Sequence, residues 1–324
     1  MTMRLKFVAL AFSILVPSLA VGQSAPNSAV LYMNVIDKSI GKPLNGLRPE
    51  EIRLKIGSTV VPVISVKEDG NSRRLAIVLD SSGSMEPGKP KWLIASSLAA
   101  AIAATAPSSA ALSFVAFGSK ELKVLHSGND HREIVEQITA LRDQPPSAKG
   151  LQRTSLWDSL ARIVDQPLPL QRGDSIFVIT DGADNVSHID AAKVEKRLSS
   201  LGIRVFAFVL ASGDSDDPKT QEEIDAPQNL REFAGGTGGD CFILHGHSGP
   251  GRNRPTNFSI GPQDRQNIQD VIFNFLTDAV HPYRVELDSS TSTKPGKIKV
   301  DIVENGVERK NVIVLAPARM SPSN

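Results

Sequence analysis

The 324-residue chain is predicted to fold as an α/β protein, with a doubly wound, mostly parallel sheet that has helices on both faces and is flanked by a small β-sandwich. In the middle of the chain, short apolar runs alternate with helical patterns, an order typical of βαβ units. On both sides of this region, apolar and polar residues alternate as in half-buried strands. We therefore expect an N-terminal β module at residues 28–69, an α/β domain at 72–282 and C-terminal β strands at 283–316.

Two apolar runs of the central region are typical of strands buried on both faces of a sheet. Leu75 to Leu79 ends in Asp80, and Ile176 to Thr180 is followed by Asp181. Helical patterns between and after these runs complete the βαβ units. Further strands are expected at 111–117, 205–210 and 241–244. One helix is expected at 90–105, a second begins at Asp130, a third begins at Thr154 and a fourth ends at Gly202. The last helix has an apolar stripe formed by Ile268, Val271, Ile272, Phe275, Leu276 and Ala279.

The two flanks carry strand and turn signals but little else. Ile52, Leu54 and Ile56 alternate with charged residues, and Asn305-Gly306 is a strong hairpin turn. Each flank is too short to bury a stable core alone. We therefore expect both flanks to pack together as one sandwich, with the α/β domain inserted between them.

The N-terminus has the pattern of a cleavable signal peptide, expected at residues 1–23. Arg4 and Lys6 precede an apolar run at 7–16, which is too short to span a bilayer, and Ser18-Leu19-Ala20 offers small residues at its first and third positions for cleavage. No later stretch is long and apolar enough to cross a membrane. The mature protein is therefore expected to be secreted or periplasmic, without a membrane span.

Composition excludes several other classes. Lys and Arg number 36 against 35 Asp and Glu, a net charge of +1, so no basic excess indicates a nucleic-acid partner. Cys241 is the only cysteine, which makes an intramolecular disulfide impossible.

Asp80 and Asp181 are the first candidates for a functional site. In a doubly wound sheet of order 3-2-1-4-5-6, their strands are neighbours at the point where the strand order reverses, and ligands bind beyond the carboxyl ends of the strands there. The two carboxylates would then face each other, with no basic residue nearby in sequence to neutralise them. A divalent cation would resolve this repulsion.

Three hydroxyls complete the expected ligand set. In an extended loop, Ser82 and Ser84 would point the same way as Asp80, and Thr154 adds a fourth oxygen from another loop. Oxygen ligands suit Mg²⁺, Ca²⁺ or Mn²⁺, with Mg²⁺ the first expectation. Because the hydroxyls add no charge, the ion stays electrophilic. Such a site would grip an Asp or Glu side chain of a partner protein.

Four motifs, LAIVLDSSGSM, TSLWDSL, VITDGADN and FAGGTGGDCF, closely resemble the von Willebrand factor type A (VWA) domain over about residues 72–282. The resemblance implies a Rossmann-like fold and a metal-ion-dependent adhesion site, with Asp80, Ser82, Ser84, Thr154 and Asp181 as the five ligands. It also implies two states of the site, in which Asp181 binds the ion directly or through water. The segment before the domain resembles the β module of a group of exported bacterial VWA-related proteins.

Two other functions have to be weighed against a binding module. A metal-dependent hydrolase would need a nucleophile or a general base, but the chain has no G-x-S-x-G elbow and no histidine in the ligand motifs, so we expect no catalytic residues and no enzyme activity. A structural envelope protein with a vestigial site is the other alternative. The intact five-residue set argues against it.

Overall fold

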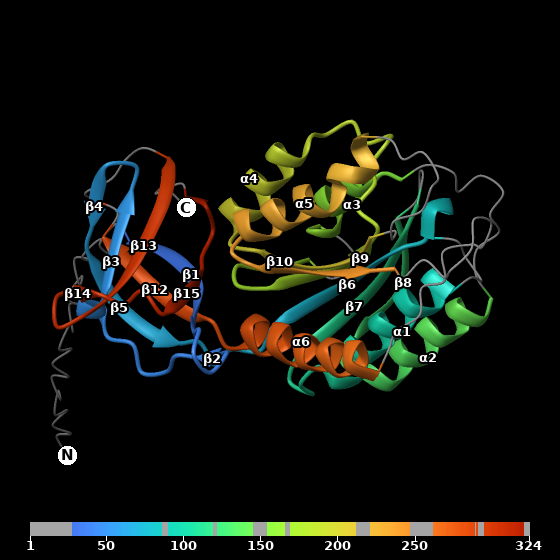
Figure 1. Ribbon diagram of the computed structural model, residues 1–324, viewed down its shortest axis with the longest axis horizontal. Coiled ribbons are helices and arrows are strands. Elements are labelled where there is room, and N and C mark those ends of the chain that lie inside the picture. Colours follow the sequence, from blue (N-terminus) through green and yellow to red (C-terminus); the bar gives the residue numbers. More distant parts are fainter. Residues whose placement is uncertain are drawn as a thin grey trace, which may run out of the picture.

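The chain forms an α/β part around one central sheet and a β-sandwich made of two antiparallel sheets (Figure 1). The predicted fold class, including the flanking sandwich, is confirmed. The exact domain boundaries stay predictions, and the predicted signal peptide lies outside the described residues. This computed structural model describes residues 28–85, 90–118, 122–144, 154–165, 169–211, 221–246, 262–288, 290 and 295–320. In these ranges no helix is both long enough and apolar enough to cross a membrane.

The central sheet has six strands in the order β11-β10-β9-β6-β7-β8. Neighbours are parallel except for β8, an edge strand that runs antiparallel to β7 and was not expected from the sequence. As predicted, the strands that end at Asp80 and before Asp181 are neighbours. The strands are β6 (Arg74–Asp80), β7 (Ala111–Phe117), β8 (Leu122–Gly128), β9 (Ser175–Thr180), β10 (Arg204–Ala211) and β11 (Asp240–His245).

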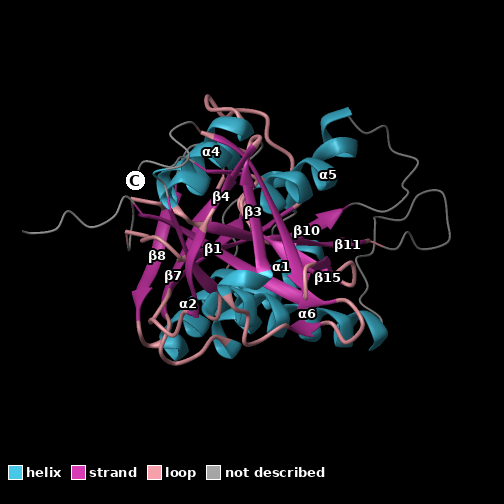
Figure 2. Ribbon diagram, turned by 90° about the vertical axis from the view of Figure 1, so that its left-hand side faces the viewer, coloured by secondary structure: helices cyan, strands magenta, loops and turns pink. Residues whose placement is uncertain are grey.

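Helices cover both faces of this sheet (Figures 1 and 2). Alternate residues of β6 point to opposite faces: Leu75 and Ile77 pack against α1, α2 and α6, whereas Ala76 and Val78 pack against α3, α4 and α5. The helices are α1 (Pro90–Thr105), α2 (His131–Asp143), α3 (Leu156–Ile163), α4 (Ala191–Leu201), α5 (Gln221–Gly236) and α6 (Pro262–Val280).

Local sequence signals fix several helix ends. The Asp130 side chain accepts hydrogen bonds from the backbone N–H groups of Arg132 and Glu133, which caps α2 as predicted. Helix α4 ends at Gly202, whose φ of 67° is a left-handed conformation that favours glycine. These ends limit the connections that return the chain to the sheet.

The sandwich is built from both flanks of the chain. One sheet has the order β15-β1-β12-β5 with β2 beside β1, and the other has β14-β13-β3-β4 with β16 beside β13. Pro62 separates β4 from β5 and marks the point where the chain changes sheet, since proline cannot donate a ladder hydrogen bond. The strands are β1 (Ser28–Asp37), β2 (Lys42–Pro43), β3 (Ile52–Ile56), β4 (Thr59–Val61), β5 (Val63–Glu68), β12 (Tyr283–Asp288), β13 (Gly296–Glu304), β14 (Val307–Glu308), β15 (Val312–Leu315) and β16 (Arg319–Met320).

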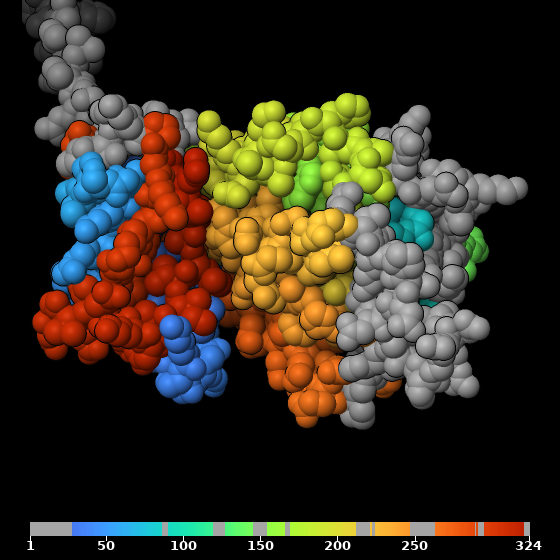
Figure 3. All heavy atoms as spheres, turned by 45° about the horizontal axis from the view of Figure 1, so that its top comes forward, coloured from blue at the N-terminus to red at the C-terminus, as the bar shows by residue number. Residues whose placement is uncertain are grey.

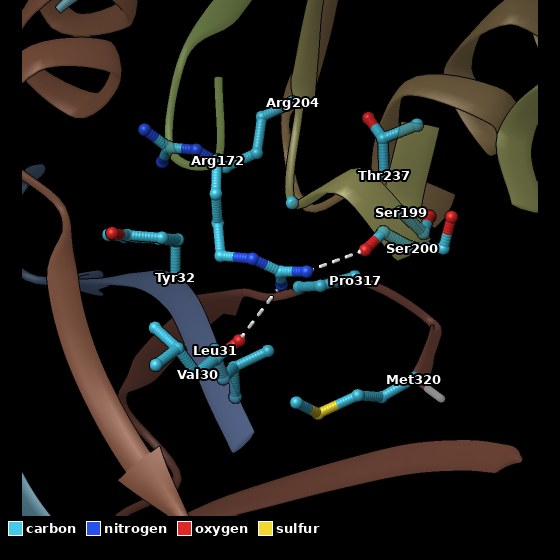
Figure 4. A pocket seen from close by; sticks show the side chains of 11 residues that line it. Val30, Leu31, Tyr32, Arg172, Ser199, Ser200, Arg204, Thr237, Pro317 and Met320 are labelled. Atoms are coloured by element: carbon cyan, nitrogen blue, oxygen red, sulfur yellow. Dashed lines mark hydrogen bonds between the residues drawn. The ribbon is translucent and has the colours of Figure 1, made fainter. Parts of the chain in front are cut away.

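Buried polar contacts join the sandwich to the α/β part. The guanidinium of Arg204, only 1% exposed, donates to the side chain of Asn34 in β1 and to the carbonyl oxygen of Ala279 in α6. Burial lowers the pKa of Arg204 to about 10, which still leaves it charged at neutral pH. Arg172 donates to the carbonyl oxygens of Ser200 and Val30 (Figure 4). The last described residues also lie against the α/β part, where Pro317 pairs with Thr237 and the backbone N–H of Ala318 donates to the carbonyl oxygen of Gly236; the deep red atoms in Figure 3 show this contact.

The shared core of the sandwich predicts a large effect of Leu287→Ala. Leu287 is fully buried in a cluster that contains side chains of both flanks. Removing it should lower the free energy of unfolding by about 2–5 kcal/mol, measured by chemical denaturation. The control is Val60→Ala on β4, 56% exposed, which should change it by no more than about 0.5 kcal/mol. Equal effects of the two substitutions would contradict a core shared by the two flanks.

Candidate metal centre

The candidate site lies at the carboxyl edge of the two neighbouring strands β6 and β9. Asp80 is the last residue of β6, and Asp181 comes directly after β9. The two strands pair in parallel, with Leu79 opposite Ile179, so both carboxylates belong to the same edge of the sheet. This edge is where ligands of doubly wound sheets bind.

Asp80 is fully buried and already partly hydrogen-bonded. Its Oδ1 accepts from the backbone N–H of Ser82 at 2.8 Å, and its Oδ2 accepts from the hydroxyl of Thr180 at 2.6 Å. Burial raises the pKa of Asp80, and the charge of Asp181 raises it further, against the lowering effect of these hydrogen bonds. A negative charge at Asp80 is therefore costly unless a cation lies close by.

The two serines lie together, although not for the reason expected from the sequence. The loop after Asp80 is not extended, because residues Gly83–Met85 form a turn of 3-10 helix. The hydroxyls of Ser82 and Ser84 still lie 2.9 Å apart. Ser82 is buried and Ser84 is exposed, so the pair extends from Asp80 towards the surface.

Thr154 is buried just before α3 and is tied to the loop that follows Asp181. Its backbone N–H donates to the side-chain oxygen of Asn185 at 2.9 Å, and its carbonyl oxygen accepts from the backbone N–H of Asn185 at 3.1 Å. Thr154 therefore joins the candidate site through Asn185.

Two further acids strengthen this connection, and sequence reasoning did not assign them this role. Asp184 Oδ1 accepts from the backbone N–H of Leu156 at 2.8 Å, at the start of α3. Asp158, in α3, accepts from the backbone N–H groups of His188 and Ile189 at 3.0 and 3.1 Å. The loop after β9 and α3 are thus joined by two sets of hydrogen bonds, one accepted by the loop and the other accepted by the helix.

A buried lysine is the most important residue that sequence reasoning missed. The ammonium of Lys91 donates to Asp181 Oδ2 at 2.7 Å and to the carbonyl oxygen of Ser84 at 3.0 Å. The side chains of Lys91 and Asp181 are only 6% and 10% exposed. The expectation that no basic residue neutralises the two carboxylates was therefore wrong. Lys91 is the second residue of α1, and the start of α1 lies at the same edge of the sheet as Asp80.

The residues at this edge fit a hard divalent cation. Carboxylate and hydroxyl oxygens are the ligands preferred by Mg²⁺, Ca²⁺ and Mn²⁺. The ammonium of Lys91 bonds to Asp181, and among the described side chains it is one positive charge at an edge with two carboxylates. Within the described ranges, no three or more His, Cys, Asp or Glu side chains gather as a metal-ligand group. The candidate set has only two acidic members and takes its other oxygens from hydroxyls.

Several solved structures are similar to parts of this chain, each with a TM-score below 0.5. No curated protein matches the chain. Among solved structures, a conserved hypothetical protein, BatB, from Bacteroides thetaiotaomicron is 14% identical, with a TM-score of 0.44, and the alignment covers 63% of this chain and 98% of BatB. A von Willebrand factor type A protein from Catenulispora acidiphila is 12% identical, with a TM-score of 0.44 and coverage of 91% and 74%. Manganese-loaded TRAP protein from Plasmodium vivax is 14% identical, with a TM-score of 0.40 and coverage of 79% and 97%.

The family model for the von Willebrand factor type A domain matches residues 75–245. This range begins in β6, ends with β11 and includes Asp80, Thr154 and Asp181. It spans more than half of the chain, and the chain therefore belongs to the von Willebrand factor type A domain family.

Proposed function

We propose that this protein is an exported binding module that holds a divalent cation, first of all Mg²⁺, and uses it to grip an Asp or Glu side chain of a partner protein. Domains of this family are protein-interaction modules, which supports the class of function. The observation that carries the proposal is the buried Asp80 beside Asp181 at an edge rich in oxygen ligands, where the described residues place one ammonium beside two carboxylates. Export is proposed from the signal-like pattern at residues 1–23.

The proposed ligands divide into two kinds, which explains why the site would bind a partner. Asp80 and Asp181 supply negative charge, whereas Ser82, Ser84 and Thr154 supply only neutral oxygens. A bound dication would therefore keep positive charge for an outside carboxylate. Ser84 is the exposed member of the set, so a partner would approach beside it.

Mg²⁺ should stabilise the protein. At about 100 times its dissociation constant, a ligand stabilises the folded state by roughly 2.7 kcal/mol, which corresponds to a rise in melting temperature of about 5–10 °C. Asp80→Ala and Asp181→Ala should abolish the rise, as measured by differential scanning fluorimetry. The matched control is Asp165→Ala, whose carboxylate is 66% exposed in a surface ion pair and which should keep the rise. The same rise in all four proteins would place the metal elsewhere.

Partner binding should depend on the same residues. Immobilised wild-type protein should retain an exported protein in Mg²⁺ and release it in EDTA, and Asp80→Ala should retain none. Asp165→Ala should behave as wild type. A partner that is retained equally in EDTA would contradict binding through a cation.

Thr154→Ala should separate metal binding from partner binding. Both bonds between Thr154 and Asn185 are made by the Thr154 backbone, so the substitution removes the hydroxyl and leaves the two loops joined. A neutral hydroxyl contributes little to the charge of the site, so Mg²⁺ affinity should stay within about threefold. Affinity for the retained partner should fall at least about tenfold, or about 1.4 kcal/mol, because the Thr154 hydroxyl is proposed to favour the state in which Asp181 binds through water and the ion takes an outside carboxylate.

Isothermal titration with Mg²⁺, and then with the partner, measures the two affinities. The control is Thr154→Ser, which keeps a hydroxyl and should bind the partner as wild type does. If Thr154→Ala binds the partner as tightly as wild type while Asp80→Ala does not, Thr154 does not select the state in which Asp181 binds the ion through water.

A further inference from the structure

Lys91 holds an unusual place at this site, because a buried charge contacts two of the proposed ligand residues. Its ammonium bonds to a carboxylate oxygen of Asp181 and to the backbone carbonyl oxygen of Ser84. The bond to Ser84 leaves the Ser84 hydroxyl with Ser82, at 2.9 Å. The lysine therefore neutralises Asp181 without using the hydroxyl that the proposed function assigns to the cation.

We propose that Lys91 is a positioning residue of the metal centre. Its positive charge lowers the affinity of the site for its cation and in return raises the affinity of the bound cation for an external carboxylate. This inference rests on the proposed function and deepens it. In this proposal Lys91, which is not one of the five ligands, sets the balance between metal affinity and partner affinity.

The charges of the buried groups give the first argument. Among the described residues at this edge, Asp80 and Asp181 would offer two negative charges to a bound dication and Lys91 one positive charge, a net charge of −1. The loaded site would then carry +1, where the same site without Lys91 would be neutral. That surplus charge opposes metal binding and favours a carboxylate from outside.

The contact with Asp181 gives the second argument. Oδ2 of Asp181 is already bonded to Lys91 at 2.7 Å, and Oδ1 lies 3.4 Å from the backbone N–H of Ala183, a weak contact. A carboxylate held in this way is a weaker ligand for a cation than a free one. Lys91 therefore favours the state in which Asp181 stays back from the ion, and a weaker Asp181 ligand leaves the ion more electrophilic.

The size of the effect follows from electrostatics. A monovalent and a divalent cation roughly 6 Å apart repel by an amount worth about tenfold in binding, even with the screening of bulk water. Because Lys91 and Asp181 are almost fully buried, screening at this site is weaker than in bulk water. Removal of the charge should therefore raise metal affinity by about tenfold or more.

Two substitutions of Lys91 in the full-length protein separate its charge from its role in packing. Lys91→Gln keeps a hydrogen-bond donor for Asp181 and removes the charge, whereas Lys91→Arg keeps both. Isothermal titration with Mn²⁺ should show affinity about tenfold or more above wild type for Lys91→Gln, and within about threefold of wild type for Lys91→Arg. Circular dichroism and chemical denaturation check that both variants are folded.

Acetate serves as the probe for the second half of the proposal. Mn²⁺ held by the protein enhances the relaxation of acetate protons in proportion to acetate bound at the ion, and the enhancement is measured by NMR at saturating protein. It should fall in Lys91→Gln and be kept in Lys91→Arg. An unchanged or stronger enhancement in Lys91→Gln would overturn the proposal that Lys91 raises the affinity of the bound ion for an external carboxylate.

The remaining outcomes separate this inference from the proposed function. If wild type binds Mn²⁺, Asp80→Ala abolishes binding and Lys91→Gln binds no more tightly than wild type, the inference fails and the metal site stands. If both Lys91 variants lose Mn²⁺ while wild type binds it, Lys91 is only structural and the inference again fails. If neither wild type nor Lys91→Gln binds Mn²⁺, both proposals fail.

Discussion

Asp80 and Asp181 share the carboxyl edge of the neighbouring strands β6 and β9, where burial makes two negative charges costly. The doubly wound order of the sheet creates this proximity, since β6 lies between β7 and β9 and both loops leave the sheet on the same side. Hydrogen bonds to Asp80 and the buried ammonium of Lys91 reduce the repulsion between the two carboxylates. Among the described residues one negative charge is left over, and the proposed dication would more than offset it.

The fold could be predicted because the pattern of apolar and polar residues along each strand reflects which of its faces are buried. Strands buried on both faces, such as Leu75 to Leu79, are continuous apolar runs, and the alternation of Ile52, Leu54 and Ile56 marks the half-buried sandwich. Strand β8 was not predicted because Leu125 follows Val124 and breaks the alternation of apolar and polar residues. The pairing of both flanks was predicted from their strand patterns and their short length. The strand registers could not be predicted, because they depend on contacts between distant segments.

Only those residues of the candidate site that belong to short sequence motifs could be predicted. Asp80, Ser82 and Ser84 lie within five residues of one another, and Asp181 follows a clear strand. Lys91 carries no such signal, since a lysine near the start of a helix is normally solvated, and only the tertiary structure brings it to Asp181. The role of Asn185 in holding Thr154 was missed for the same reason, because the partners of its hydrogen bonds lie about thirty residues away.

The most direct test of the account is a crystal structure of the wild-type protein grown with saturating Mn²⁺, with anomalous diffraction data that locate the metal. The account predicts one peak within bonding distance of the hydroxyls of Ser82 and Ser84, beside Asp80, with Lys91 still bonded to Asp181. A structure without a peak at this edge, or with the metal bound at another place on the molecule, would contradict the claim that the buried carboxylates form a cation site.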